Sequence, residues 1–187
     1  MNLNSLVMLR RMAHNNAWAN LRLHHAVSQL SDAEYHAPRV GFFPTLHRTF
    51  AHILFVDRFY LGSLEELKIP TADLWKELEL WEKEKGFADI AAAQHQADQR
   101  LIRFTYGLHT EASLAAPVQI DRTSHVQVER CGDVLLHLFQ HQIHHRGQAH
   151  CMLSGTAVKP PQLDEFFMAE DLPLREAELR ELGLPLV

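Results

Sequence analysis

Residues 133–148 read DVLLHLFQHQIHHRGQ. Apolar side chains recur at helical spacing through this stretch and just beyond it, which predicts a helix over about residues 132–154. At about 100° per residue, Gln148 and four histidines fall within about one third of the helix circumference; the histidines are His137, His141, His144 and His145. Because an unsatisfied polar group is costly to bury, histidines on a covered helix need partners, and a metal ion is a candidate partner.

Apolar residues at helical spacing predict three more long helices, over about residues 6–30, 44–66 and 87–108. Between them we expect a loop over residues 31–43 and, over the acidic residues 70–86, a loop with a short helix. Alternating residues within 117–130 predict a small hairpin. Four long helices with a long connection favour an antiparallel bundle, an architecture that places metal sites on facing helices. We therefore predict an all-α fold, an up-down-down-up-like four-helix bundle with a hairpin between its third and fourth helices.

The composition limits the class of protein. A chain of 187 residues with 47% hydrophobic content suffices for one full core. We expect a single domain over residues 1–187, with the bundle over about 3–155 and a tail with one or two short helical turns over 156–187. A net charge of -5 without a basic block argues against nucleic acid. No signal-peptide layout and no apolar run of about 18 residues is present, so we expect a cytoplasmic protein without membrane contact.

The chain has two cysteines, Cys131 and Cys151, which fall in the same predicted helix. They would lie about 30 Å apart along it, which is too far for a disulfide. We expect reduced thiols, as in cytosolic proteins. Cys151 falls within the apolar pattern, where a packing role is expected.

Spacing alone leaves the choice of metal ligands open. The pairs His137/His141 and His141/His145 both have the i, i+4 spacing at which two imidazoles can meet one cation, and His144 lies on the same face. The H-E-x-x-H pattern of metalloproteases and the Glu-x-x-His pattern of di-iron bundles are both absent. A mononuclear site would therefore need at least one ligand from elsewhere in the chain.

The helix predicted over residues 44–66 offers His47 and His52 as that further ligand. The two lie about 140° apart around a helix, so both cannot point inward. His52 is the better inward candidate, because it shares its face with apolar residues, namely Phe55, Val56 and Phe59.

The sequence resembles the DinB/YfiT-like family of four-helix-bundle metalloproteins over nearly its whole length. The resemblance lies in residues 16–20 (NAWAN), in residues 45–54 (TLHRTFAHIL) with Asp57-Arg58, and most specifically in residues 137–148. Members hold a divalent metal, nickel or zinc, with three histidines. One comes from the middle of the second helix and two from an H-x-x-x-H pair whose second member precedes Arg-Gly-Gln. Transferred position by position, the resemblance implies the ligands His52, His141 and His145, with zinc or nickel as the metal and iron as a further option.

Three neutral imidazoles leave coordination positions open, as in catalytic zinc sites. Characterised relatives include transferases and isomerases that use low-molecular-weight thiols. The resemblance therefore implies a metal-dependent enzyme of the thiol S-transferase or hydrolase type, with a small-molecule substrate such as a low-molecular-weight thiol. It also implies a homodimer. The alternative is a non-catalytic metal-binding stress-response or interaction protein, and the sequence identifies no catalytic residue besides the metal ligands.

Polar neighbours of the ligands have separate expected roles. His137 and Gln148 are candidates to hydrogen-bond a ligand imidazole, as metal-bound histidines usually require. His144 is expected to face a neighbouring helix or solvent. Gly147 is expected either to permit close approach of another helix or to be a glycine that the helix merely tolerates.

Arg146 has three alternative environments in the sequence-based interpretation. It can pair with Asp57, pair with Glu129, or lie on a solvated face, and the sequence does not choose among them. Asn16 and Trp18 are expected to be packing and helix-contact residues.

Overall fold

The computed structural model describes residues 4–186. Over these residues the chain is predominantly helical with one small sheet, as predicted. The elements in chain order are α1 Ser5–Val27, α2 Asp32–His36, α3 Leu46–Leu64, α4 Thr71–Glu84, α5 Phe87–Gly107, η1 Glu111–Ala115, β1 Pro117–Asp121, β2 Val126–Arg130, α6 Cys131–Leu153, η2 Ala169–Asp171 and α7 Leu172–Glu181. None of the helices in this part of the chain combines the length and the apolar character needed to cross a membrane.

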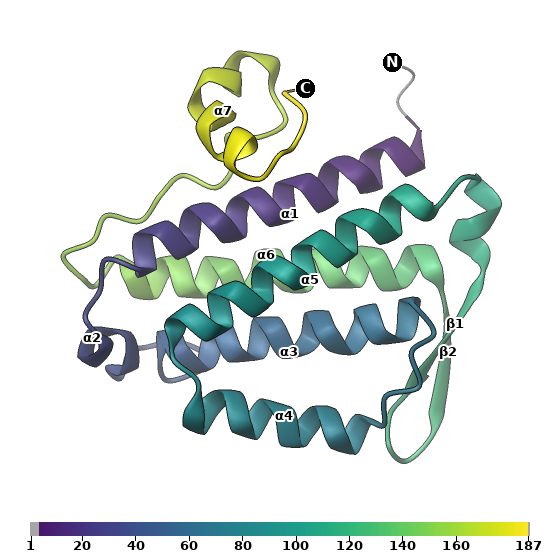
Figure 1. The fold of residues 1–187 in the computed structure, drawn as a ribbon, viewed down its shortest axis with the longest axis horizontal. Helices are drawn as coiled ribbons and strands as arrows, with labels where there is room; N and C mark the ends of the chain where they lie inside the picture. Colours follow the sequence, from purple (N-terminus) through teal and green to yellow (C-terminus); the bar gives the residue numbers. More distant parts are fainter. Residues whose placement is uncertain (1–3, 187) are drawn as a thin grey trace.

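The core lies between the four long helices α1, α3, α5 and α6. Helices α1 and α3 each pack against both α5 and α6, and Figure 1 shows the four lying side by side. Each contributes a side chain that is at most 1% exposed, namely Trp18, Leu54, Leu101 and Leu138. Burying one such side chain contributes about 1.5–3 kcal/mol, so the shared apolar core holds the four helices together. The up-down-down-up order of the helices stays a prediction.

Side-chain caps fix where two helices begin. Thr45 precedes α3, and its Oγ1 accepts a hydrogen bond from the N–H of Arg48 at 3.1 Å. Ser31 and Glu34 form a reciprocal capping box at the start of α2. The predicted loop over residues 31–43 is therefore wrong in its first part, because this box initiates a helix of five residues.

Residues 71–84 form the helix α4, which is 14 residues long and therefore more than the short helix predicted there. It packs along α3, on the side away from α1 (Figure 1). The Phe55 and Trp75 rings lie 4.6 Å apart between their centroids, and Arg58 Nη2 lies 2.9 Å from Glu77 Oε1. The acidic composition made this helix hard to predict, because only Leu74 and Thr71 are buried and most of its charged residues are exposed.

The predicted hairpin is present as β1 and β2, which pair antiparallel with Val118 opposite Glu129. It connects α5 to α6 and contacts α3. The Thr71 hydroxyl donates to the Asp121 carbonyl at 2.8 Å, which ties the end of β1 to the start of α4. The hairpin therefore has a fixed position at one end of the long helices (Figure 1).

Helix α7 packs against α1, on the side opposite α4 (Figure 1). Arg22 Nε donates to Glu178 Oε1 at 2.9 Å across this contact. With ten residues, α7 is longer than the one or two short turns predicted for the tail.

Both cysteines are free thiols. Cys131 is buried, whereas Cys151 is exposed. The packing role predicted for Cys151 is therefore wrong, because its position on α6 faces away from the other helices.

Candidate metal centre

His52 on α3 meets His141 and His145 on α6 where the two helices pack together. One possible ligand atom from each residue lies within 4.8 Å of the other two. The Nε2 atoms of His52 and His141 are 3.0 Å apart, and the ring centroids of His141 and His145 are 4.4 Å apart. These three imidazoles could hold one metal ion.

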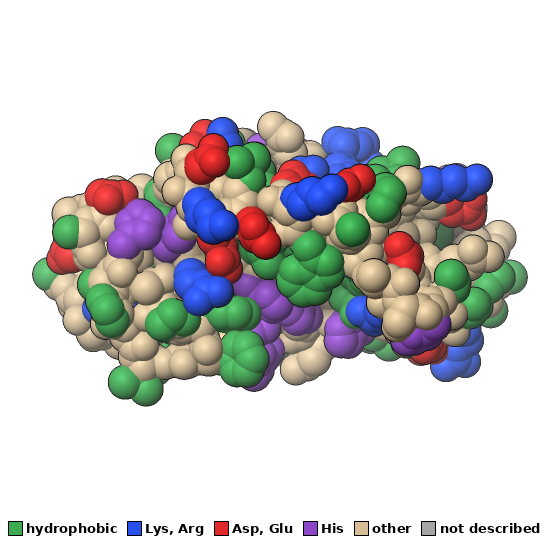
Figure 2. Space-filling view, turned by 90° about the horizontal axis from the view of Figure 1, so that it is seen from below, with side chains coloured by type: hydrophobic (Ala, Val, Ile, Leu, Met, Phe, Trp, Pro, Cys, Tyr) green, Lys and Arg blue, Asp and Glu red, His purple; other side chains and the backbone are tan. Residues whose placement is uncertain are grey.

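Aromatic residues before α3 cover one side of the three imidazoles. The Phe43 ring centroid lies 4.5 Å from that of His52 and 5.7 Å from that of His145. His145 is buried, whereas His52 and His141 are partly exposed. The site is therefore reachable from one side, and Figure 2 shows histidine side chains gathered among hydrophobic ones near the middle of the face seen from below.

The three imidazoles are electrically neutral at pH 7. Burial, reinforced by the neighbouring His145, lowers the pKa of His52 to about 4. Burial, together with the surrounding histidines, lowers the pKa of His141 to about 3, and burial also lowers the pKa of His145. A metal must bind the deprotonated imidazole, so no proton has to be removed first.

A neighbouring amide fixes the tautomer of one imidazole. His145 Nδ1 lies 2.9 Å from Gln148 Oε1, and because an amide oxygen only accepts, this nitrogen carries the proton. The Nε2 lone pair of His145 is then free, which is the usual arrangement of a metal-bound histidine. His141 Nδ1 is buried without a hydrogen-bond partner among residues 4–186. Three neutral imidazoles, one of them oriented in this way, form a donor set that fits a divalent metal.

His137 and His144 lie outside this group, and both are exposed. The His137 ring centroid is 6.4 Å from that of His141 and 5.1 Å from that of Tyr60. Within the described residues, His137 makes no hydrogen bond to a candidate ligand, in contrast to what the sequence suggested. His144 Nε2 lies 3.0 Å from Gln148 Nε2, so it accepts from the amide that orients His145.

Gly147 lies on the exposed side of α6. A Cβ added there would meet no heavy atom within 4 Å, so the predicted close approach of another helix is wrong. Glycine costs about 1 kcal/mol relative to alanine inside a helix. We therefore expect Gly147→Ala to raise the free energy of unfolding by about 1 kcal/mol, measured by urea denaturation. A lower free energy of unfolding in Gly147→Ala would contradict this prediction and would show that the added methyl group meets a neighbouring residue.

A buried polar network lies on the inner side of the same α6 segment. Its members come from α1, α3, α5 and α6 and are at most 4% exposed: Asn16, Asn20, Asp57, Gln94, Asp98, Gln142 and Arg146. Arg146 Nη1 donates to the side-chain oxygens of Asn16, of Asn20 at 3.0 Å and of Gln142 at 3.1 Å. Because Arg146 directly follows His145, the same turn of α6 presents His145 to the candidate metal centre and Arg146 to the network.

Asp57 and Asp98 supply the carboxyl groups of the network. Asp98 Oδ1 accepts from the amides of Asn16 at 3.0 Å and Asn20 at 2.9 Å, and Gln94 Nε2 donates to Asp57 Oδ2 at 2.6 Å. Burial raises the pKa of Asp98 to about 8 and that of Asp57 to about 6. The Arg146 guanidinium acts against this rise in the pKa of both carboxyl groups, but burial outweighs it.

Sequence reasoning missed this network, although a signal was present. Asn16 and Asn20 are spaced i, i+4, as are Gln94 and Asp98, so each pair lies on one helix face. Asn16 is therefore more than a packing residue. For Arg146, the solvated-face alternative is wrong, and its hydrogen bonds go to amide oxygens rather than directly to Asp57 or Glu129.

Of two pockets beside the helices in the described part of the chain, one touches the histidine group. A pocket of about 240 Å³ has His137 and His141 on one side and an aromatic wall on the other, formed by Phe55, Phe59, Tyr60 and Trp75. It lies between α3, α4 and the hairpin. A molecule bound in it would contact one of the three candidate ligands.

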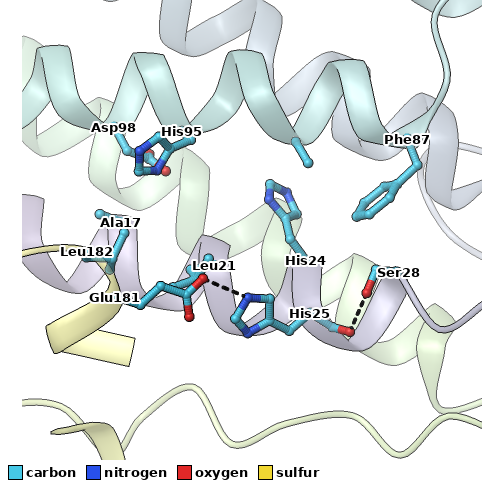
Figure 3. Close-up of a pocket in the computed structure, with 11 residues that line it drawn as sticks. Ala17, Leu21, His24, His25, Ser28, Phe87, His95, Asp98, Glu181 and Leu182 are labelled. Atoms are coloured by element: carbon cyan, nitrogen blue, oxygen red, sulfur yellow. Dashed lines mark hydrogen bonds and ion pairs between the residues drawn. The ribbon is translucent and has the colours of Figure 1, made fainter. Parts of the chain in front are cut away.

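The larger pocket, of about 440 Å³, lies between α1, α5 and the C-terminal segment. His24, His25, His95 and Asp98 line it, and His25 Nε2 lies 3.2 Å from Glu181 Oε1 (Figure 3). In the described part of the chain these groups do not converge as His52, His141 and His145 do. Despite its size, this pocket is therefore the weaker candidate for a metal-dependent function.

His24, at this larger pocket, gives a pH prediction. It packs against Phe50 and Phe87, and burial lowers its pKa from 6.5 to about 3. Below pH 6.5 the unfolded chain takes up a proton that the folded chain does not, so stability falls as the pH falls toward 3. Between about pH 7 and pH 5 this group should cost about 2 kcal/mol.

His24→Leu should remove that dependence, because leucine fills a similar space without titrating. Urea denaturation of metal-free protein at both pH values measures the difference between the wild type and the variant. Metal-free protein is required so that the three candidate ligands behave alike in both. Equal pH slopes in the two proteins would contradict the prediction.

Together, the fold and the site define a predominantly helical protein in which histidines from two helices form a candidate metal centre. The sequence model of the DinB family matches residues 1–176, so the chain belongs to the DinB family. A crystal structure of a DinB-like protein from Bacillus cereus ATCC 10987, at 2.01 Å resolution, is similar, with a TM-score of 0.56 and 16% identity. The match covers 78% of this chain and 90% of that one and shows the fold alone. No curated protein matches this chain.

Proposed function

We propose that this protein is a metal-dependent enzyme that binds one divalent ion, zinc or nickel, through His52, His141 and His145. The observation that carries the proposal is the convergence of three neutral imidazoles beside a pocket. In residues 4–186 no fourth histidine, cysteine or carboxylate joins the group. A three-ligand set leaves a position for substrate, as in catalytic zinc sites.

A divalent ion held there would supply Lewis-acid chemistry to a thiol or a water molecule. The chain's own residues orient the ligands, shield the site and guide the substrate. Gln148 holds the His145 ring in one tautomer, and Phe43 shields two of the imidazoles on one side. The pocket at His141 directs a substrate toward the site from the side of α4 and the hairpin.

The reaction we propose is thiol S-transfer to an electrophile or hydrolysis of an ester or amide. The resemblance to family members that are thiol-using transferases and isomerases supports this class, and the partial exposure of His52 and His141 supports a small-molecule substrate such as a low-molecular-weight thiol. A homodimer and a cytoplasmic location belong to the same proposal, and sedimentation at micromolar concentration tests the dimer.

The test is a screen of metal-loaded protein with glutathione and other cellular thiols against electrophiles, alongside ester and amide substrates. Activity should require the metal and should be abolished in His145→Ala. His144→Ala is the matched control, because it removes the adjacent exposed histidine and should retain activity. Unchanged rates in His145→Ala would contradict the proposal.

The non-catalytic alternative predicts a different coordination sphere. A purely structural metal that joins α3 to α6 would have its coordination sphere completed by a fourth protein ligand. His137 is the candidate for that ligand on α6. The distance between the rings of His137 and His141, 6.4 Å between centroids, favours an open sphere instead. Water exchange at the bound metal separates the two: rapid exchange supports the enzyme, and none supports the structural metal.

A further inference from the structure

We propose that the pocket beside His141 binds a small organic monocarboxylate, with the guanidinium of Arg122 as its anchor. The proposal rests on the proposed function, because the other end of the bound molecule would face the metal ligands. It adds the chemical class of the second substrate, the molecule that the thiol or water would attack, which neither the fold nor the family specifies.

Arg122 lies at the end of the hairpin and lines this pocket. Its Nε donates to Gln127 Oε1 at 2.8 Å, and its Nη2 donates to the Tyr60 hydroxyl at 3.0 Å. The guanidinium also lies over two rings of the pocket wall, 5.2 Å from the Phe59 centroid and 5.6 Å from the Tyr60 centroid. These contacts hold the side chain in one orientation.

The guanidinium of Arg122 retains N–H donors that could bind a ligand. Arginine carries five N–H donors, and the two bonds to Gln127 and Tyr60 leave three of them unused. Among the described residues, no carboxylate lies within 4.0 Å of Arg122. An oriented cation without an acidic partner, at the edge of a pocket, is suited to bind a carboxylate in two-pronged fashion.

The charges around the pocket favour a ligand with one negative charge over a dianion. Asp121 also lines it. The N–H groups of Thr123 and Thr71 donate to its two carboxylate oxygens, at 2.8 Å and 3.3 Å, and these bonds hold its pKa below the usual range. Asp121 is therefore ionised, and it would repel a phosphate dianion more strongly than a monocarboxylate.

The size and walls of the pocket specify the rest of the ligand. At about 240 Å³, the pocket lies just below the about 300–1,000 Å³ typical of sites for drug-sized molecules. Phe55 lies between Phe59 and Trp75, with ring centroids 6.2 Å and 4.6 Å away. Such a wall accepts a flat apolar body, so a compact aromatic or apolar acid fits best.

The experiment compares benzoate with benzamide, which has the same shape and no charge. Calorimetric titration into metal-free and metal-loaded protein should show benzoate binding in both forms and much weaker binding of benzamide. Arg122→Gln should weaken benzoate binding about tenfold or more, since a hydrogen bond to a charged group contributes about 1.5–3 kcal/mol. Arg122→Lys, which keeps the charge, should lose less, and it guards against a folding defect in the glutamine variant.

Arg130→Gln is the matched control, because it makes the same change on the same hairpin at a side chain that is 70% exposed and pairs with Asp133. It should bind benzoate like the wild type. Equal benzoate affinity in Arg122→Gln and wild type would overturn the inference. Benzoate binding that requires the metal and does not depend on Arg122 would also overturn the inference, because the carboxylate would then bind the metal. The proposed function would survive that outcome. If the protein takes up no metal but still binds benzoate in an Arg122-dependent way, the proposed function alone is contradicted.

Discussion

Arg146→Met is expected to lower the free energy of unfolding by about 3–5 kcal/mol, because three buried amide oxygens lose a charged donor and each unsatisfied buried acceptor costs about 1–3 kcal/mol. Arg146 is 4% exposed, and its guanidinium bonds to side chains of both α1 and α6. Without it, Asp57 and Asp98 would share a buried site with no positive charge. Urea denaturation at neutral pH measures the loss.

Arg180→Met is the control for removing a guanidinium. Arg180 is 66% exposed at its side chain and pairs only with Glu176, so its replacement should change stability by no more than about 0.5 kcal/mol. Adding Asp57→Asn to Arg146→Met should recover part of the loss, because Asp57, with a pKa of about 6, is ionised at neutral pH and the arginine no longer balances its charge. A loss below about 1 kcal/mol in Arg146→Met would mean that the network contributes little.

His141→Ala is expected to abolish stoichiometric metal binding. The wild type, purified without an affinity tag and loaded with zinc or nickel, should retain about one ion per chain, because its three imidazoles converge on one point. Removing the central ligand should weaken affinity by more than about 100-fold, since loss of a residue that merely orients a ligand already costs 10- to 100-fold. Elemental analysis and competition with a chelator measure both quantities.

His144→Ala is the matched control, because it deletes an exposed histidine of the same helix that lies outside the group. It should keep its metal, with at most the small loss expected from freeing the Gln148 amide. Stoichiometric metal in His141→Ala, or none in the wild type, would contradict the assignment of the site.

Much of the fold could be predicted because helical periodicity is a local property. The long helix over residues 131–153 and the hairpin before it are recognisable from spacing alone. Helix α4 was underestimated because its apolar residues are few and its charges many, so its stability depends on packing against α3. Cys151 and Gly147 show the same limit: a helical pattern places residues on a face, but it does not say which part of that face another helix covers.

The 3.6-residue period alone predicts a helical chain in which His141 and His145 share one helix face. Family resemblance added His52. Three further facts appear only in the folded chain: His52 lies within reach of that pair, Arg146 faces a buried network and not solvent, and Arg122 lines a pocket at His141. Those facts depend on how α1, α3, α5, α6 and the hairpin pack, and packing joins residues far apart in the chain that no local pattern connects.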